Sequence, residues 1–349
     1  MKATASCQFP LLNEWKSYCD HNKICAFADS VISGYAQLAF NDNTFSGILM
    51  MLATVLGSPV LFVSAIWATI VATLTAHAIK LPEAGIRAGL YNVNAALSGL
   101  AVPPLLFANQ GLSIPMLLVS TFIGIITVFL GLLVGKFFEK HNLPSLVIPY
   151  CICLLSFLAF MAITGITNNA PLSLDALVMT CSASDWSLHS IGTAFLNSAS
   201  QIVWLSNPLS GLLYLIALTF ASRADFFNTL VAIIISIFVA ILIGLPQDPV
   251  INGHYGYNAI LLIQVLSRSF KSNVHTRIFS FAMVSLTPVM CVIYQLILTS
   301  FGISSFLALP YLTICFPTLV CMRKHSNFIF VSPKHWGVPE TIQKINQET

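Results

Sequence analysis

Two glutamines in an otherwise apolar chain have the residue type and spacing that best fit the binding of a polar solute. Each is followed three residues later by an aromatic residue and six residues later by an asparagine. The two copies read Gln37-x-x-Phe40-x-x-Asn43 and Gln201-x-x-Trp204-x-x-Asn207. A glutamine amide offers one acceptor oxygen and two N–H donors. A ring three positions later lies on the same side of a helix, so each copy combines a polar group with a flat apolar face.

A second motif also occurs twice, as GLYNVNAAL at 89–97 and GHYGYNAIL at 253–261. Within it, Val93 precedes Leu97 by four residues and Tyr257 precedes Leu261 by four, so each pair lies on one helical face. An apolar slot edged by hydrogen-bond acceptors suits a small, flat, neutral molecule that is rich in N–H donors. The acceptors replace the water that such a solute loses, while the apolar faces exclude hydrated species.

Each of these residues alone also has a purely structural explanation. A buried glutamine commonly braces two helices, and a single aromatic side chain usually packs in the core or against lipid. Thr313, a further candidate acceptor, could bond a carbonyl of its own helix. The repetition favours binding, because both motifs recur at one offset (201 − 37 = 253 − 89 = 164). The chain therefore reads as a duplicated half.

The elements that carry these motifs are predicted to be membrane helices. Of the 349 residues, 57% are hydrophobic and only 8% are charged, against roughly 25% charged in soluble domains. Apolar stretches such as 116–134 and 227–245 approach the roughly 20 residues that a helix needs to cross a bilayer. We therefore expect an all-α polytopic membrane protein.

Hydropathy predicts about ten transmembrane helices, five in each half. The first and third of each half contain Gly, Pro or Asn interruptions, so we expect some of these spans to be broken or re-entrant. The first five spans are expected near 31–56, 59–79, 84–107, 113–137 and 144–164, and the second five near 195–221, 226–246, 252–270, 276–300 and 301–322. The predicted divisions are an N-terminal segment 1–30, a first repeat 31–164, an extracytoplasmic connection 165–194, a second repeat 195–322 and a cytoplasmic tail 323–349.

The distribution of basic residues predicts the orientation. With the N-terminus in the cytoplasm, all Lys and Arg residues of the connections fall on the cytoplasmic side, Arg268 among them, as the positive-inside rule expects. Both termini are then cytoplasmic. Because each half has an odd number of spans, the second half enters from the opposite side, which makes the two halves inverted repeats with the solute path at their interface.

At this point the sequence resembles the urea transporter family, in particular its bacterial-type facilitative channels. The likeness covers roughly residues 30–322. It is carried by Gln201-x-x-Trp204-x-x-Asn207-Pro208-x-Ser210-Gly211, by its copy from Gln37, by Gly253-x-x-Gly256-Tyr257-Asn258-x-x-Leu261, and by the pairs Leu143-Pro144 and Leu309-Pro310.

The resemblance implies a homotrimer in which each protomer has its own urea slot, with acceptor oxygens along one wall and side chains that clamp the flat solute. By motif position the acceptors would be Gln37, Gln201 and Thr313. The clamping residues would be Phe40, Val93, Leu97, Trp204, Tyr257 and Leu261.

The first half departs from the family pattern at four positions. Val147 stands where a threonine is expected after the first Leu-Pro pair, as Thr313 follows the second. Val93 replaces an aromatic residue, Asn92 a glycine, and Thr44 the proline found at 208. An alternative is therefore an uncoupled channel for another small neutral solute, such as a short amide or ammonia, and loss of transport is a further possibility.

Other classes of function lack their residues. We find no nucleophile with a matching base, no metal-ligand spacing and no phosphate-binding glycine loop, so we expect no enzyme activity, cofactor or nucleic-acid partner. An ion-coupled carrier would place carboxylates within its spans, whereas here the acidic residues fall in termini, connections and span ends. An uncoupled path in a bacterial inner membrane is the preferred prediction, and a structural or signalling membrane protein remains a third.

Overall fold

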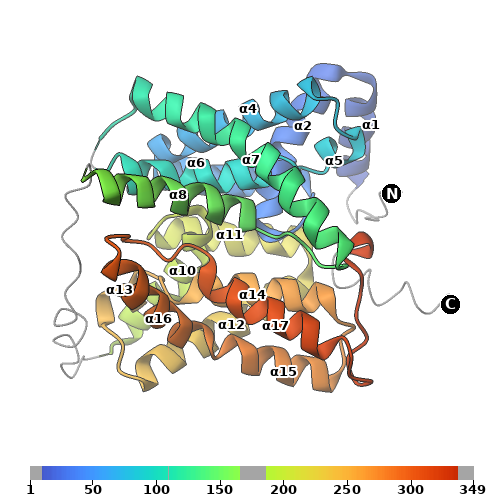
Figure 1. Cartoon of the computed structure of the whole chain (residues 1–349). Coiled ribbons are helices and arrows are strands. Elements are labelled where there is room, and N and C mark those ends of the chain that lie inside the picture. Colours follow the sequence, from blue (N-terminus) through green and yellow to red (C-terminus); the bar gives the residue numbers. More distant parts are fainter. Residues whose placement is uncertain (1–9, 109, 166–185, 337–349) are drawn as a thin grey trace. The chain divides into compact units, whose positions relative to one another are not determined.

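The computed structural model describes residues 10–108, 110–165 and 186–336, and these residues are folded mainly as helices (Figure 1). Among them, the strand-like pairing is limited to an isolated bridge between Phe270 and Phe330. The outer part of the predicted N-terminal segment, most of the predicted 165–194 connection and the end of the predicted tail lie outside the described residues.

The chain forms two compact units. The first contains the residues up to Tyr150 together with Leu213–Arg223, and the second contains Cys151–Leu212 and Ala224–Trp336. Three helices contribute residues to both units, namely α8 (Ile148–Thr164), α11 (Pro208–Ala221) and α12 (Arg223–Leu242), of which only Arg223 belongs to the first unit.

In the first unit, α4, α6 and α7 lie side by side (Figure 1). The helices of this unit before α8 are α1 (Pro10–His21), α2 (Lys23–Ala36), the 3-10 turn η1 (Gln37–Ala39), α3 (Thr44–Gly57), α4 (Pro59–Ala78), α5 (Glu83–Arg87), α6 (Val93–Leu106) and α7 (Ile114–Lys140). Small residues make this packing close, because the Ser64 hydroxyl donates to the Gly99 carbonyl at 2.8 Å and Ala68 and Ala95 share one buried cluster. Helices that approach this closely gain dispersion contacts without large side chains.

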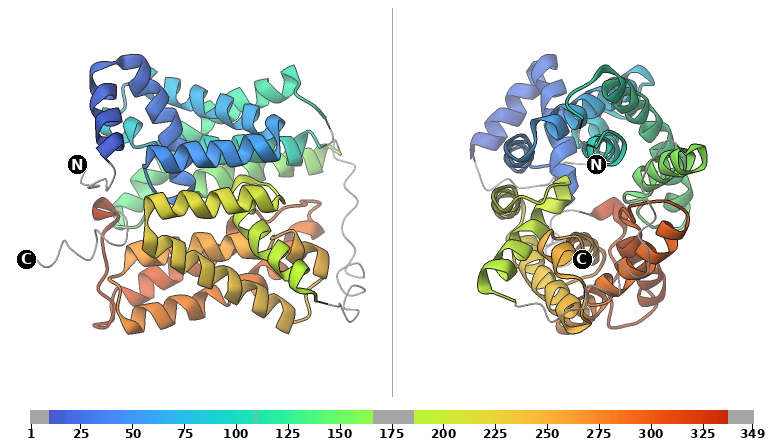
Figure 2. Two further views of the ribbon diagram at one scale, coloured as in Figure 1. Left: turned by 180° about the vertical axis from the view of Figure 1, so that it is seen from behind. Right: turned by 90° about the vertical axis from the view of Figure 1, so that its left-hand side faces the viewer.

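In the second unit, α14 packs against α17, and α15 and α16 lie next to α14 (Figure 2). Besides its part of α8 and α11, this unit contains α10 (Leu188–Ser200), the 3-10 turn η2 (Gln201–Val203), α12 (Arg223–Leu242), α13 (Gln247–Ile251), α14 (Gly256–Ser269), α15 (Val274–Val284), α16 (Thr287–Ser300), α17 (Leu309–Met322) and η3 (Pro333–His335).

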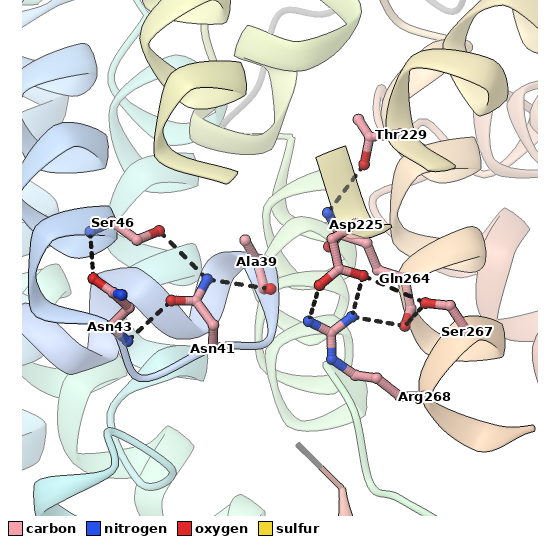
Figure 3. Close-up of polar contacts among 9 residues, drawn as sticks. All are labelled: Ala39, Asn41, Asn43, Ser46, Asp225, Thr229, Gln264, Ser267 and Arg268. Atoms are coloured by element: carbon pink, nitrogen blue, oxygen red, sulfur yellow. Dashed lines mark hydrogen bonds and ion pairs between the residues drawn. The ribbon is translucent and has the colours of Figure 1, made fainter. Parts of the chain in front are cut away.

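A buried ion pair joins α12 to α14 in the second unit (Figure 3). Arg268 donates to both carboxylate oxygens of Asp225, at 3.0 and 2.6 Å, and the two side chains are 1% and 0% exposed. The sequence analysis placed Arg268 in a cytoplasmic connection, and this was wrong. Arg268 is one of several basic residues on which the predicted orientation rests, and its burial does not bear on the others.

The interruptions predicted in the first and third spans are confirmed. In the first unit, α2 ends at Ala36 and α3 begins only at Thr44, while α5 ends at Arg87 and α6 begins at Val93. At the start of the second half, the segments Leu188–Val203 and Pro208–Ala221 are bent by 72° relative to each other.

These interruptions shorten the helices below the length of a full span. Among the described residues, four helical segments are long and apolar enough to cross a membrane, namely Pro59–Ala78, Ile114–Lys140, Arg223–Leu242 and Val274–Ser300, and the bent pair could be a fifth. Four further apolar helices are shorter than a full span, namely Thr44–Gly57, Val93–Leu106, Ile148–Thr164 and Leu309–Met322. The prediction of about ten spans therefore stays a prediction.

The local backbone structure recurs at the offset of 164 that the motifs have (246 − 82 = 253 − 89 = 164). Pro82 and Pro246 each precede a short helix, with φ of −53° and −54°. Gly89 and Gly253 follow those helices with φ of +72° and +80°. Such positive φ values favour glycine, and a Cβ on either glycine would collide with the backbone of the facing helix, at Ser33 or at Asn197.

Candidate functional site

Each glutamine of the first motif begins a 3-10 turn that ends on an aromatic residue in the left-handed backbone region. Phe40 has φ of +53° and Trp204 has φ of +61°, and both are half-buried. This conformation costs a bulky residue about 1 to 3 kcal/mol, and strain of this kind clusters at functional sites. The same strain at matched positions therefore points to a shared role for the two turns.

The motif asparagines cap the helices that restart after these turns. Asn43 accepts from the Ser46 N–H at 3.2 Å, and Asn207 accepts from the Ser210 N–H at 3.2 Å (Figure 3 for Asn43). Asn43 also donates to the Phe220 carbonyl at 3.0 Å. These side chains therefore satisfy backbone N–H groups that the break in each helix leaves without a partner.

The two glutamine amides are oriented by the same contact. The Gln37 Nε2 donates to the Ala88 carbonyl at 2.8 Å, and the Gln201 Nε2 donates to the Asn252 carbonyl at 2.8 Å. A carbonyl oxygen can only accept, so the amide nitrogen must face it and the amide oxygen Oε1 must face away. Gln201 gives its second N–H to the Ser206 hydroxyl at 2.8 Å. Each glutamine oxygen therefore points away from the backbone carbonyl that orients its amide.

The second motif is held by its asparagine. In the first unit Asn94 Oδ1 accepts from the Tyr150 N–H at 3.2 Å, which attaches the start of α8 to α6. In the second unit Asn258 Oδ1 accepts from the Tyr311 N–H at 3.3 Å, which attaches α17 to α14. Turns η1 and η2 pack against α6 and α14 respectively. Three elements thus meet in each unit, and each meeting place carries predicted site residues.

The residues at these meeting places can be stated unit by unit. In the first unit they are Gln37, Phe40, Val93, Leu97 and Val147, and in the second they are Gln201, Trp204, Tyr257 and Leu261. Leu97 and Leu261 are 8% and 6% exposed, Val147 is 4% exposed, and the others are half-buried.

The predicted pairing of Val147 with Thr313 is wrong. The tyrosine contacts to the motif asparagines give an offset of 161 in this region, and the left-handed residues Leu146 and Leu307 agree (311 − 150 = 307 − 146 = 161). Val147 therefore corresponds to Ala308, and Thr313 corresponds to an isoleucine at 152. The error arose because the pair Leu143-Pro144 was matched to Leu309-Pro310, whose true counterpart is Ile148-Pro149.

Thr313 lies one turn into α17 rather than at the meeting place. Its hydroxyl donates to the Leu309 carbonyl at 2.9 Å, so the Tyr294 hydroxyl, 2.6 Å away, must donate to Thr313. One lone pair of the Thr313 oxygen is thereby occupied. Thr313 as an acceptor for solute stays a prediction, with Tyr294 as a neighbour that the sequence analysis missed.

Two departures of the first half have a structural explanation. The Thr44 hydroxyl donates at 2.8 Å to the buried carboxylate of Asp29, which also accepts from the Trp15 ring N–H at 2.8 Å. Asn92 donates to the Ser30 carbonyl at 3.0 Å and to the Thr73 hydroxyl at 2.8 Å. Both residues therefore attach helices to one another beside the site.

Asn92 fits because the residue facing it is Gly34, where an added Cβ would collide with the Asn92 amide. In the second unit the sizes are exchanged, since Gly256 faces Ser198 and a Cβ on Gly256 would collide with the serine side chain. The glycine expected at 92 is thus present at 34 instead. This compensation could have been found in the sequence by comparing both positions across the repeat.

Phe306 and Leu307 also belong to the second meeting place, although the sequence analysis did not name them. The Tyr257 ring stacks on Phe306 with centroids 6.2 Å apart and planes 4° apart, and its hydroxyl donates to the Leu307 carbonyl. No sequence signal marks Leu307, because its role depends on a positive φ of 49° at a residue that usually avoids it.

Within the described part of the chain, no group of three or more His, Cys, Asp or Glu side chains could hold a metal ion. The buried carboxylates there are Asp29 and Asp225. Asp29 accepts from Trp15 and Thr44, and Asp225 accepts from Arg268.

Comparison with known proteins identifies the family of the chain. The family model described as urea transporter matches residues 28–323, which include both copies of both motifs. Proteins named Urea transporter 1 are 24% identical over 260 residues in Rattus norvegicus, 26% over 252 residues in Mus musculus and 25% over 248 residues in Ovis aries. Each alignment covers 69% of this chain and 63% of the relative's length. The chain belongs to the urea transporter family, whose members are integral membrane transporters and not enzymes.

Proposed function

We propose that the chain provides a facilitative, channel-like path for urea across a membrane. The observation that supports this best is the pair of glutamines whose nitrogens are held by backbone carbonyls, so that each oxygen remains an acceptor beside an aromatic side chain. Urea is flat and neutral and carries only N–H donors apart from its carbonyl. Acceptors at fixed positions replace its water of hydration, while the aromatic and aliphatic side chains contact its faces.

The proposed path lies between two inverted five-helix repeats, with urea passing first one glutamine and then the other. Its lining would be Gln37, Phe40, Val93, Leu97, Val147, Gln201, Trp204, Tyr257, Leu261 and Thr313. We further propose a homotrimer in lipid with one path in each protomer and both termini in the cytoplasm. We also propose a bacterial inner membrane. This part rests only on the short connections of the chain, because the named relatives are mammalian.

The solute itself is part of the proposal. The relatives are named for urea, but the chain spans 63% of their length, so their activity is extended to it here as an inference. A path for short amides or ammonia is the second candidate. It is favoured by Ile152, which matches Thr313 of the second half and lacks the hydroxyl expected from the family pattern.

Stopped-flow light scattering of proteoliposomes tests both candidates. We expect rapid, saturable urea entry, and we expect Gln201→Leu to slow it about tenfold, because one hydrogen bond to the solute is worth roughly 1 kcal/mol or somewhat more. The matched control is Gln295→Leu, since Gln295 donates within its own helix to Thr299 at 3.0 Å.

Unchanged urea entry in Gln201→Leu, with Gln295→Leu also unchanged, would remove Gln201 from the path. Entry of acetamide or ammonia in the unmodified protein without urea entry would favour the second candidate over the first.

A further inference from the structure

The N-terminal helix α1 carries no residue of the proposed path, yet three of its side chains bond to segments that hold Gln37 and Phe40. α1 packs against α2 in the first unit (Figure 1). Its residues Trp15, Lys16 and Asp20 bond to α2, to the loop before α3 and to α5 respectively. Residues 37–44 are called the first turn below, and the matched residues 201–208 the second turn.

Trp15 holds the end of the first turn through a buried carboxylate. Its ring N–H and the Thr44 hydroxyl both donate to Oδ1 of Asp29, each at 2.8 Å, and Asp29 is 2% exposed. A buried carboxylate needs such donors, because they replace the water that the charge has lost. Asp29 therefore ties α1 to the last residue of the first turn.

Lys16 holds the middle of the first turn. Its ammonium group donates to the Asp42 carbonyl at 3.2 Å and lies 3.8 Å from the Asp42 carboxylate. Asp42 comes two residues after Phe40, whose backbone is left-handed. Lys16 therefore fixes the segment of chain that leaves the aromatic residue.

Asp20 reaches the other side of the first turn through α5. Its carboxylate accepts from Arg87, the last residue of that helix. The next residue, Ala88, supplies the carbonyl that holds the Gln37 amide at 2.8 Å. The contacts of α1 thus extend both to the segment after Phe40 and to the carbonyl that orients Gln37.

The second turn is closed by its own serine. The Ser206 hydroxyl accepts from Gln201 at 2.8 Å and donates to the Asn252 carbonyl at 3.2 Å. The same carbonyl accepts from the Gln201 amide at 2.8 Å. Glutamine, serine and carbonyl are therefore joined directly in one ring of hydrogen bonds.

The first turn cannot form this ring. Asp42 stands where the second turn has Ser206, and the Ala88 carbonyl matches that of Asn252 (206 − 42 = 252 − 88 = 164). An ionised carboxylate only accepts, so Asp42 cannot donate to the carbonyl as the serine does. The Asp42 carboxylate faces Lys16 instead. A contact from α1 thus replaces one that the second turn makes with its own side chain.

We propose that Trp15, Lys16 and Asp20 are positioning residues for urea binding, and that α1 holds the first turn in the geometry in which Gln37 and Phe40 meet the solute. The inference rests on the proposed function and adds to it a difference between the two turns. The second turn keeps its geometry by itself, whereas the first depends on α1. Release of α1 lowers the fraction of protein that can bind at the first turn, and with it the apparent affinity for urea.

The first experiment is Trp15→Phe, which removes the indole donor and keeps an aromatic ring. Hydrogen exchange of peptides that span residues 37–44 measures how firmly the first turn is held. We expect exchange there to become about tenfold faster, because a hydrogen bond to a charged group is worth about that factor. Saturation of urea entry into proteoliposomes measures the effect on binding. The half-saturating urea concentration should rise about threefold, which corresponds to a turn that is competent about a third of the time.

The matched control is Trp67→Phe. It removes an indole hydrogen bond of the same length, 2.8 Å, to Thr121, and that bond joins α4 to α7. Exchange of residues 37–44 and the half-saturating urea concentration should both stay unchanged in this variant. Equal changes in Trp15→Phe and Trp67→Phe would reveal a general loss of stability and would overturn the positioning role.

The second experiment transfers the serine contact to the first turn, and it also keeps the test valid if Trp15→Phe fails to fold. Lys16→Met removes the charge, and it should speed exchange of residues 37–44 and raise the half-saturating urea concentration as Trp15→Phe does. Asp42→Ser then adds a hydroxyl that can donate to the Ala88 carbonyl, as Ser206 donates to its counterpart. The double variant Lys16→Met with Asp42→Ser should therefore regain the values of the unmodified protein.

Each remaining outcome decides one part of the inference. Unchanged exchange in folded Trp15→Phe and Lys16→Met variants would overturn the hold of α1 on the first turn, whether or not urea moves. Faster exchange with an unchanged half-saturating concentration would overturn its role in binding. A double variant no better than Lys16→Met would overturn the difference between the turns. Faster exchange in a protein that carries no urea would overturn the proposed function while supporting the hold of α1.

Discussion

At the scale of single residues, the proposed path depends on side chains that use some polar atoms within the protein and leave others for the solute. Gln37 and Gln201 donate to backbone carbonyls and present their oxygens. Asn94 and Asn258 use their oxygens to hold the neighbouring helix start, so they act as positioning residues. The same amide chemistry thus serves binding at one position and architecture at another, according to which atom the protein occupies.

The exchange of sizes between Gly34 and Asn92 leads to a prediction on stability. Asn92→Gly removes two hydrogen bonds, to Ser30 and to Thr73, and should lower the free energy of unfolding by about 2 kcal/mol. Gly34→Ser should also destabilise, because its side chain collides with the Asn92 amide. The double variant Gly34→Ser with Asn92→Gly reproduces the pattern of the second unit and should be more stable than Gly34→Ser alone.

Thermal unfolding of the three variants in detergent measures this coupling as a double-mutant cycle. Purely additive effects of the two substitutions would contradict the compensation. The control is Ser206→Ala, which removes an exposed hydroxyl in the other unit. A change in its unfolding temperature as large as that of the Asn92 variant would show that the assay lacks specificity.

The sequence alone matched the two copies of the glutamine motif, because a repeated motif marks its own counterpart, and both copies form the same 3-10 turn. It failed for Val147 and Thr313 because two residue pairs ending in proline, at 143–144 and 148–149, lie close together and the loop of the second half is one residue longer (302 − 142 = 160, 307 − 146 = 161). The backbone contacts of Tyr150 and Tyr311 decide between the two alignments, and the tyrosine that follows Pro149 and Pro310 marks the same register in the sequence.

At the scale of elements, the breaks in the helices could be predicted and the buried charge could not. Asparagine and glycine in an apolar stretch mark a break, because they satisfy or permit irregular backbone. The burial of Arg268 is unusual, because a charged residue is rarely buried unless it has a partner. Its partner Asp225 lies 43 residues earlier, on another helix, so no local pattern joins them.

The first half has no such pair, because a leucine at 61 and a proline at 104 stand at the matched positions. We therefore expect Asp225→Leu to destabilise the protein by about 3 to 5 kcal/mol, since it leaves a guanidinium buried without its carboxylate. The double variant Asp225→Leu with Arg268→Met should recover most of that loss, as apolar residues of similar volume replace the pair.

Fluorescence-detected thermal unfolding of the detergent-solubilised protein measures both variants. The matched control is Asp20→Leu, whose partner Arg87 is only partly buried and whose own side chain is 63% exposed, and it should shift stability by less than about 1 kcal/mol. A double variant as unstable as Asp225→Leu would show that the pair has a role beyond neutralising a buried charge.

At the scale of the whole molecule, the sequence analysis placed the acidic residues in termini, connections and span ends, yet Asp29 and Asp225 are 2% and 0% exposed. Their burial does not turn them into sites for a coupling ion. Asp29 accepts from Trp15 and Thr44, and Asp225 is neutralised by Arg268. An ion-coupled carrier needs carboxylates that bind and release a cation during each cycle.

We therefore expect urea entry into proteoliposomes to be unaffected by a sodium or proton gradient. The measurement compares the initial rates of urea entry with and without the gradient, at the same urea concentration in both experiments. Acceleration or uphill accumulation would contradict an uncoupled path, and Asp29→Asn would then show whether the buried carboxylate is responsible.

The double tether of Gln201, to the Asn252 carbonyl and the Ser206 hydroxyl, also bears on the speed of permeation. A glutamine that is free to rotate loses about 1.5 to 2 kcal/mol of configurational entropy when it is immobilised, whereas a side chain confined to one rotamer before the solute arrives has little left to lose. The activation barrier is then mainly the enthalpy of stripping water from the permeant. The Arrhenius slope of permeation should accordingly report dehydration of the solute and not a rearrangement of the polypeptide.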